Sequence, residues 1–476
     1  MTDITTFFER DDRVQVYRPG MVRDEATCVL YWMQRAQRGQ DNAALNAAIA
    51  LGNQLELPVV VLFVLSDYPA ANLRHYTFML EGIRTAAHYL QKRGTPLVIR
   101  RGSPPQEVVR LANELRAAAV ISDEGELRTP RAWRAEVKAA LDIPFACVDS
   151  DVVVPMKYFP KEEWAARTIR PKIQRLLPTY LQPITDLEST HPLNTPPCDA
   201  GDTVNPLSYL DTLSLDRSVA PSPTFHGGQD EGRHRVSQFI QNLLSSYGSK
   251  RNNPEIEGTS ALSAYLHFGH ISVQQTAWDV EQYVPETTGS AQIDESGGRA
   301  AYLEELIVRR ELAINFALRN PHYDSLAGCP QWGKDTLKKH TSDPRPWNYT
   351  REELEQARTH DELWNASQRE MMQTGRMHGY MRMYWAKKIL EWTVTPEQAF
   401  EDAVYLNDKY EIDGRDANGY TGIAWAIGGK HDRPWAPERP IFGLVRYMAL
   451  SGMQRKMDTR AYIYRWRASE TQKELL

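Results

Sequence analysis

Residues 58–65 read PVVVLFVL, and residues 28–33 read CVLYWM. Each is an unbroken apolar run of strand length, which is typical of a strand buried on both faces of a parallel sheet. Between them, residues 41–55 read DNAALNAAIALGNQL, with helical spacing and an Asp/Asn start signal. A strand, a helix and a second strand in this order predict one βαβ unit.

The same alternation continues through the first third of the chain. Further helices are expected at 74–93, 104–116 and 130–141, and further strands at 96–100, 117–122 and 144–149. Repeated β and α units predict an α/β fold with a doubly wound parallel sheet. Such sheets bind ligands at the carboxyl ends of their strands. No G-x-G-x-x-G motif follows the first strand, so the sequence does not support a dinucleotide bound there in the Rossmann manner.

The pattern changes after residue 182. Residues 183–232 are rich in Pro, Ser, Thr, Asp and Gly, which predicts a long interdomain linker on the surface. From Arg233 onward the periodicity is almost wholly helical. We therefore expect an α/β domain at 1–182, a linker at 183–232 and an all-α domain at 233–476.

Composition excludes several classes of protein. The 476 residues are 42% hydrophobic with a net charge of −5, which excludes a mostly disordered chain and a basic nucleic-acid coat. The longest apolar run, 59–65, is far shorter than the roughly 20 residues of a membrane span. Four scattered cysteines form no metal motif and favour a reducing cytoplasm. Residues 426–476 carry ten Lys/Arg and five Asp/Glu, which fits either a phosphate backbone or a solvated helical face.

Two motifs in the helical part allow a structural and a functional interpretation. Residues 259–272, TSALSAYLHFGHIS, place hydroxyls at the start of a helix, where they either cap the helix or hold a phosphate. Residues 302–316 place Glu305 and Arg309 four positions apart, as an exposed pair or as a buried hydrogen-bonding carboxylate.

Two later segments are rich in aromatic residues and glycine. In residues 371–392, Trp385 and Trp392 are seven positions apart on one helix face, either as core residues or as a path for electron hopping. Residues 405–425, YLNDKYEIDGRDANGYTGIAW, are interpreted as a loop that wraps a ligand.

Taken together, the motifs resemble those of the photolyase/cryptochrome family. TSALSAYLHFGHIS is similar to that family's flavin-phosphate segment, and TGRMHGYMRMYW (374–385) to its flavin-cradling helix. DGRDANGYTGIAW (413–425) resembles its Asp-Gly loop, and EELIVRREL (304–312) and FGLVRYM (442–448) fit as well. The class II branch is indicated by YWMQRAQRGQDNAAL (31–45), by the Trp385/Trp392 spacing and by Gly379-Tyr380.

The resemblance implies a class II cyclobutane pyrimidine dimer photolyase. Such enzymes bind FAD in a helical C-terminal domain behind an α/β antenna domain. In light, the reduced FAD gives one electron to a pyrimidine dimer that is flipped out of UV-damaged DNA, and the cyclobutane ring splits. A deazaflavin antenna is expected in preference to a folate. We expect a cytoplasmic monomer with no membrane, metal or obligate protein partner.

The resemblance also implies roles for individual residues. The flavin pyrophosphate is expected at Thr259, Ser260, Leu262 and Ser263, and a charge pair beside its ring at Arg382 and Asp413. Asn407 is expected at flavin N5, Glu305 at the carbonyl edge of the dimer, Met383 in contact with the dimer and Trp425 as an apolar wall. Electron relay is expected from Trp364, Trp385 and Trp392, in an order that the sequence does not give. From local charge, DNA binding is expected from Lys430, Arg433, Arg446, Arg455 and Lys456.

The sequence departs from the family pattern at two positions. Ala264 stands where Pro is usual, and Val308 stands where many relatives have a second Trp wall, so the lesion pocket is expected to differ in shape. The main rival interpretation is a cryptochrome that signals without repair. An unrelated two-domain nucleotide-binding protein is a second rival, and a six-four photolyase, against which the class II motifs argue, is a third.

Overall fold

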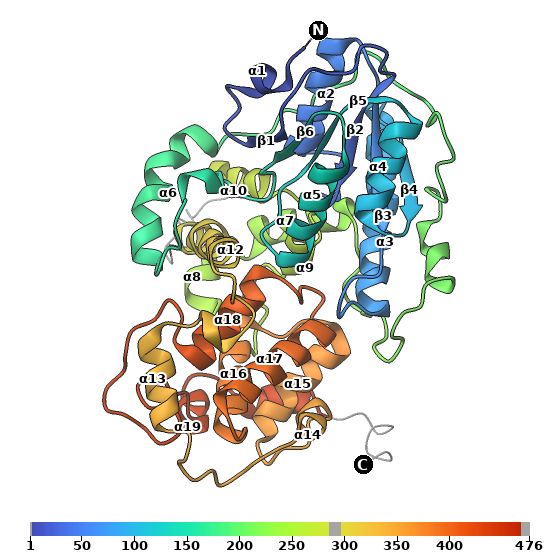
Figure 1. Cartoon of the computed structure of the whole chain (residues 1–476). Coiled ribbons are helices and arrows are strands. Elements are labelled where there is room, and N and C mark those ends of the chain that lie inside the picture. The colour runs from blue at the N-terminus through green and yellow to red at the C-terminus, as the bar shows by residue number, and fades with distance from the viewer. Residues whose placement is uncertain (1, 285–296, 468–476) are drawn as a thin grey trace.

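The N-terminal half of the chain forms a six-stranded sheet with helices on both faces (Figure 1). The computed structural model describes residues 2–284 and 297–467. The strand order is β1-β6-β5-β2-β3-β4, with every neighbouring pair parallel except β1 and β6. The strands are β1 Val14–Arg18, β2 Cys28–Met33, β3 Val59–Leu65, β4 Leu97–Arg101, β5 Ala117–Asp123 and β6 Phe145–Val148. The helices of this half are α1 Ile4–Phe8, α2 Ala43–Leu55, α3 Leu73–Lys92, α4 Pro104–Glu114 and α5 Arg128–Ala140.

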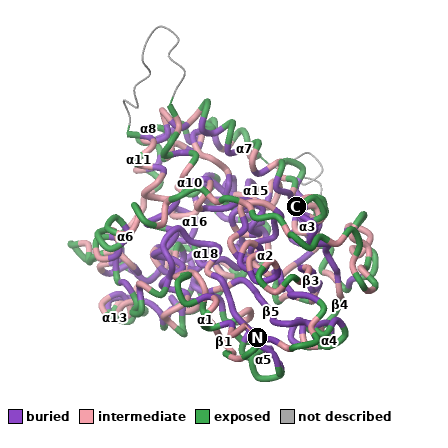
Figure 2. The backbone as a smooth tube through the Cα atoms, turned by 90° about the horizontal axis from the view of Figure 1, so that it is seen from above, coloured by how far each residue is buried: buried purple, intermediate pink, exposed green. Residues whose placement is uncertain are grey.

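Alternate residues of each strand enter different cores. In β2, Val29 and Tyr31 pack with α2 and α3, whereas Leu30 and Trp32 pack with α4 and α5. Every residue of β2, β3 and β5 is buried, as continuous apolar runs require, and Figure 2 shows β3 and β5 in the colour of buried residues. The predicted doubly wound sheet is confirmed. The antiparallel edge strand β1, with the sequence VQVYR, was not predicted, because it is only partly buried and carries no continuous apolar run.

The rest of the chain is mainly helical. The longer elements are α6 Ala166–Tyr180, α7 Gln229–Asn242, α10 Val273–Gln282, α12 Arg310–Arg319, α15 Glu362–Thr374, α16 Gly379–Trp392, α17 Pro396–Tyr410 and α18 Ala417–Gly428. The shorter ones are α8 Tyr247–Lys250, α9 Ser263–His267, α11 Gly298–Leu303, α13 Gln331–Lys339, α14 Arg351–Glu355, α19 Leu450–Gln454 and α20 Thr459–Arg465. A π-helical stretch, Glu304–Arg309, joins α11 to α12. The expected fold class, an α/β part followed by an all-α part, is confirmed.

The segment between the two halves follows the surface of the sheet domain. Residues 183–228 are irregular apart from the short helix Pro206–Asp211, and most of them are exposed or half-buried. Backbone bonds attach this segment to the sheet domain, from Leu193 N to the Gly94 carbonyl at 3.0 Å and from Ile99 N to the Ala200 carbonyl at 2.8 Å. The helical core includes residues from Val152 to Ile173, so α6 packs with the second half of the chain.

One buried carboxyl group ties these halves together. Glu311 of α12 accepts from the backbone N–H groups of Val153 at 2.7 Å and Val154 at 3.1 Å. Burial raises the pKa of Glu311 to about 8. The folded protein therefore holds a proton on Glu311 at pH values where the unfolded chain has released it.

This linkage predicts how stability depends on pH. Because the folded-state pKa is raised, the contribution of Glu311 is full below about pH 4.5 and is lost progressively as pH rises to about 8. Glu311→Gln keeps the acceptor oxygen and removes the titration. Between pH 5.5 and 7.5 its unfolding free energy should fall less steeply than that of the wild type, by about 1.4 kcal/mol per pH unit. Urea unfolding at several pH values measures both slopes. The exposed Glu352→Gln is the control, and identical slopes for wild type and Glu311→Gln would refute the prediction.

Candidate active site

Hydroxyl groups of the segment before α9 face the helical bundle. Arg376 donates to Thr259 Oγ1 at 2.6 Å. The side chain of Ser260 lies near the Tyr302 hydroxyl, and that of Ser263 near the Asp413 carboxylate. Leu262 is buried and is the N-cap residue of α9. Of the four residues expected at a pyrophosphate, Ser263 therefore lies beside another predicted residue, Asp413.

Arg382 and two carboxyl groups form the charged centre of this region. Arg382 Nη2 donates to Asp413 Oδ1 at 2.9 Å and to Glu411 Oε2 at 2.7 Å. Burial favours a higher pKa for Asp413, but attraction to Arg382 outweighs it and holds the pKa below the usual carboxyl value. Burial raises the pKa of Glu411 well above its usual value despite Arg382. Arg382 therefore lies against both carboxyl groups, and Asp413 is the one whose pKa it holds low.

Two exposed glycines of α16 and α18, Gly379 and Gly422, leave open space beside these helices near the pair. Arg382 lies deep in the fold, yet 26% of its side chain is accessible, so it faces a hollow rather than packed side chains. A Cβ atom built on Gly379 of α16 or Gly422 of α18 would meet no atom within 4 Å. The buried Nε2 of His378 has no hydrogen-bond partner among the described residues. Because His378 Nδ1 accepts from Tyr380 N at 3.1 Å, that Nε2 is an unused donor. These features fit a large polar ligand such as FAD.

Residues predicted to meet the damaged base lie around the same bundle. Met383 is one turn from Gly379 on α16, and Trp425 lies on α18; both are half-buried. Asn407 of α17 is buried, and its Nδ2 donates to Asp408 Oδ1 at 3.0 Å. A Cβ atom built on Gly419 of α18 would lie 3.0 Å from Asn407 Nδ2, so a glycine there lets Asn407 approach α18.

Glu305 lies in the π-helical stretch, a rare local winding that is frequent at functional sites. Arg251 Nη1 donates to Glu305 Oε1 at 2.6 Å, and 38% of the Glu305 side chain is accessible. Arg309 pairs with Glu304, at 3.1 Å, rather than with Glu305. The expected four-residue pair does not form, because the π-helix changes which side chains face each other.

Residues 405–425, predicted as a wrapping loop, are mostly helical. They contain the end of α17 and most of α18, and only 411–416 form a turn. The prediction was wrong about the conformation because burial of Leu406, Ala424 and their neighbours favours helices. The short turn still carries Asp413.

The three tryptophans expected to relay electrons are buried and adjacent. The rings of Trp364 and Trp385 are stacked with centroids 6.3 Å apart and an angle of 5° between their planes. Trp364 and Trp392 lie edge to face, with centroids 5.6 Å apart. Trp364 therefore stands between the other two.

The five basic residues expected to bind DNA differ in exposure. Arg433, Arg446, Arg455 and Lys456 are exposed, and the guanidinium groups of Arg433 and Arg446 lie 4.9 and 4.7 Å from the Trp435 ring. The prediction for Lys430 was wrong. This side chain is buried, with 7% accessible, and donates to Glu162 and to the Gly328 carbonyl. Its charge is therefore already neutralised inside the protein.

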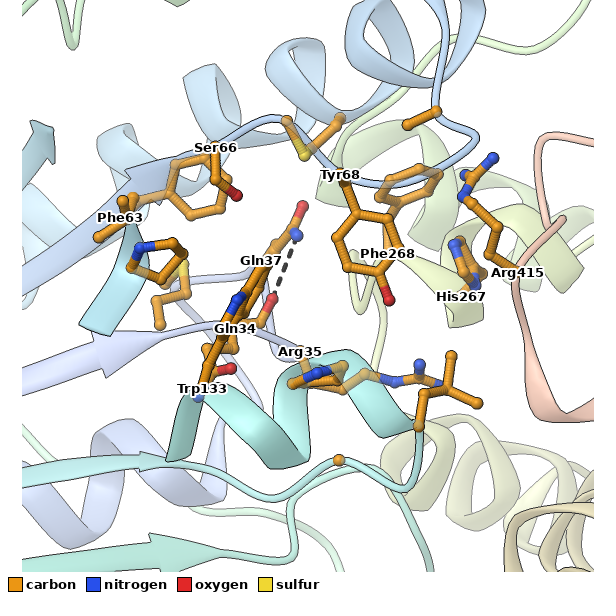
Figure 3. Close-up of a pocket in the computed structure, with 18 of the residues that line it drawn as sticks. Gln34, Arg35, Gln37, Phe63, Ser66, Tyr68, Trp133, His267, Phe268 and Arg415 are labelled. Atoms are coloured by element: carbon orange, nitrogen blue, oxygen red, sulfur yellow. Dashed lines mark hydrogen bonds between the residues drawn. The ribbon is translucent and has the colours of Figure 1, made fainter. Parts of the chain in front are cut away.

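A separate cavity lies at the carboxyl ends of the strands, where it meets the helical half (Figure 3). It encloses about 160 Å³ between Phe63, Tyr68 and Trp133 on one side and His267 and Arg415 on the other. Gln37 Nε2 donates to the Gln34 carbonyl at 3.1 Å. The side-chain Oε1 atoms of both glutamines are buried without a partner among the described residues. The cavity is thus aromatic, with two unused acceptors.

Sequence reasoning missed several partners of the predicted residues. Glu411 stands two positions before Asp413, and Arg376 lies inside the motif at 374–385, so their places in the chain were a signal. Arg251 pairs with Glu305 across 54 positions, and no local pattern marks that pairing. Within 2–284 and 297–467, no group of three or more His, Cys, Asp or Glu is arranged to hold a metal ion, and no helix is long and apolar enough to cross a membrane.

Comparison with known proteins finds similarity to DNA photolyases and to a cryptochrome. A DNA photolyase family model matches residues 29–194. The deoxyribodipyrimidine photo-lyase of Methanothermobacter thermautotrophicus is 43% identical over 444 residues, which cover 92% of this chain and 94% of the relative. The enzyme of the same name from Arabidopsis thaliana is 41% identical, covering 91% and 88%. Among solved structures, a Synechocystis cryptochrome superposes with a TM-score of 0.71 at 17% identity, covering 93% of this chain and 89% of that one.

The Arg382 pair predicts a large effect of one substitution on stability. Arg382→Met leaves the Asp413 carboxylate buried without its cation, which should lower the unfolding free energy by about 3 kcal/mol. Arg116→Met removes a pair with Glu25 in which both side chains are exposed, and should cost less than about 1 kcal/mol. Urea unfolding at pH 7 compares the two. Equal losses would show that the buried pair contributes no more than a surface pair.

Proposed function

The chain belongs to the photolyase/cryptochrome family, and from that premise we propose that it is a class II enzyme that uses light to repair cyclobutane pyrimidine dimers in DNA. Four curated relatives with 38–43% identity over nine-tenths of the chain are named deoxyribodipyrimidine photo-lyases. The observation that carries the proposal is the accessible Arg382–Asp413 pair inside the helical bundle, next to open space. The class II assignment rests on residues 31–45 and on Gly379-Tyr380.

The cofactor in this proposal is FAD. Thr259, Ser260, Leu262 and Ser263 hold its pyrophosphate, while Arg382, Asp413 and Asn407 face its ring system. When bound and reduced, FAD supplies the light-excited electron that opens the cyclobutane ring and takes the electron back once two pyrimidines have reformed. The Arg382–Asp413 pair provides a fixed local charge distribution deep in the fold, where electrostatic interactions are stronger than in bulk water.

The dimer in this proposal lies between three side chains. Glu305, oriented by Arg251, accepts or donates a hydrogen bond at the carbonyl edge of the dimer. Met383 and Trp425 supply apolar walls that exclude water. A dimer leaves the DNA helix at lower cost than an intact base, because damaged bases stack and pair poorly. Arg433, Arg446, Arg455 and Lys456 contact the phosphate backbone, whereas the buried Lys430 does not.

The cavity of Figure 3 suits an antenna chromophore. Its aromatic walls stack on a planar ring, and the free Oε1 atoms of Gln34 and Gln37 accept from the N–H or O–H groups of that ring. A deazaflavin carries such groups on one compact ring system and is proposed in preference to a folate. Since the cavity is smaller than the usual ligand pocket of about 300 Å³ or more, binding requires the lining side chains to move apart.

A cryptochrome is the alternative function. It is favoured only by the fold shared with the Synechocystis cryptochrome, at 17% identity, whereas the curated relatives with far higher identity are named as repair enzymes.

We propose that the enzyme acts as a cytoplasmic monomer on UV-damaged DNA.

The function is tested by repair of UV-irradiated oligothymidine. The purified, FAD-loaded and chemically reduced protein should restore absorbance near 260 nm under blue light and not in darkness. Glu305→Gln should lower the repair rate by about tenfold, as expected for loss of a hydrogen bond from a charged group. Glu304→Gln is the matched control, because Glu304 pairs with Arg170 and Arg309 instead. Bound FAD without any light-dependent recovery would favour the cryptochrome.

The position of Trp364 predicts a separate effect on photoreduction. Trp364→Phe removes the indole that lies between Trp385 and Trp392, so light-driven reduction of the oxidised protein by an external thiol should become much slower. Repair by the same variant after dithionite reduction should keep the wild-type rate. The exposed Trp164→Phe serves as control for photoreduction. Wild-type photoreduction in Trp364→Phe would remove this residue from the relay.

A further inference from the structure

Lys387 is a fully buried lysine next to the proposed damaged-base pocket. It lies on α16 one turn after Met383, with no accessible surface. Its Nζ donates to the carbonyl of Ala426 at 2.9 Å and lies 4.6 Å from the centroid of the Trp425 ring. Ala426 carries one of the last four carbonyls of α18, which have no N–H partner within the helix. The amine therefore connects α16 to the end of α18 at the residue proposed as the pocket wall.

The surroundings of Lys387 are unusual for a buried cation. Among the described residues, no carboxylate lies within ion-pair distance of its amine, whereas its neighbour Lys388 pairs with Glu391 at 2.5 Å. The charged groups that act on Lys387 from the segment after α18 are Asp432, which favours the ammonium form, and Arg446, which opposes it. From α18 itself the amine meets a backbone carbonyl and an indole ring.

We propose that Lys387 is a positioning residue of the repair site, whose ammonium group fixes the Trp425 indole as the wall of the damaged-base pocket. The inference rests on the proposed function, because it concerns how the pocket recognises a dimer. A cation over an indole face is attracted to it, and a cation at a helix C-terminus is attracted to the partial negative charge there. Both attractions hold the end of α18 and the Trp425 ring against α16.

The proposal has a pH dependence with a defined sign. Burial lowers the pKa of Lys387 to about 7. The ammonium form that attracts Trp425 is present below that pH and is lost as pH rises through it. The wall should therefore become less ordered above neutral pH, and selective binding of dimer-containing DNA should weaken.

The test measures the ratio of the Kd for undamaged DNA to the Kd for the same duplex with one thymine dimer. FAD-loaded protein is titrated in darkness from pH 6.0 to 8.5 at constant ionic strength, because phosphate contacts depend on salt. The wild-type ratio should fall about tenfold with a midpoint near pH 7, as loss of a desolvated cation–π contact predicts. Lys387→Met should give the low ratio at every pH. Lys388→Met, in the adjacent position, should keep the wild-type profile.

Each outcome of the titration supports or overturns the role of Lys387. A wild-type ratio that does not change with pH overturns the inference even if Lys387→Met fails to fold. A folded Lys387→Met with the wild-type ratio and profile shows that Lys387 only caps α18, and also overturns it. If the wild-type protein prefers dimer DNA and repairs it, but one of these two results is obtained, the proposed function stands. Only the role of Lys387 is then rejected. A wild-type protein with no preference for dimer DNA at any pH overturns both.

Discussion

One buried guanidinium group joins the two halves of the molecule. Arg35, which follows β2, lies 2.7 Å from Asp151, 3.2 Å from Asp416 and 3.5 Å from Glu126. Arg310 of α12 supplies a second cation to Asp151, at 2.6 Å. Separating such charges inside a protein is costly unless other groups replace the lost contacts. The cluster therefore fixes the carboxyl end of β2, the turn after β6 and the start of α18 relative to one another.

This constraint bears directly on the active site. Asp416 is the N-cap of α18, the helix that carries Trp425, and it follows the turn that carries Asp413. The short helix α9 links the two ligand regions, because Ser263 at its start meets Asp413 and His267 at its end lines the cavity of Figure 3. His267 also lies 3.1 Å from Asp416. An antenna and a catalytic cofactor bound in these places would be held at a fixed separation, as efficient transfer of excitation energy requires.

Features set by neighbouring residues could be predicted from the sequence, whereas features set by distant ones could not. The apolar runs at 28–33 and 58–65 predicted the parallel strands, because a strand buried on both faces needs consecutive apolar residues. The motif residues Arg382 and Asp413 lie together as the resemblance implies. Lys430 was assigned to DNA because sequence charge does not show burial, and its partner Glu162 lies 268 positions away. The π-helix at Glu305 and the Arg251 contact likewise depend on tertiary packing that no short pattern records.

The central claim is that one hollow between α16, α18 and the segment before α9 holds both FAD and a flipped-out dimer. A crystal structure of the FAD-loaded protein with a duplex containing a single thymine dimer tests it most directly. The account predicts the flavin ring against the Arg382–Asp413 pair, and the dimer in contact with Glu305, Met383 and Trp425. A flavin bound elsewhere in the chain, or a dimer that stays stacked in the duplex away from these three side chains, would contradict it.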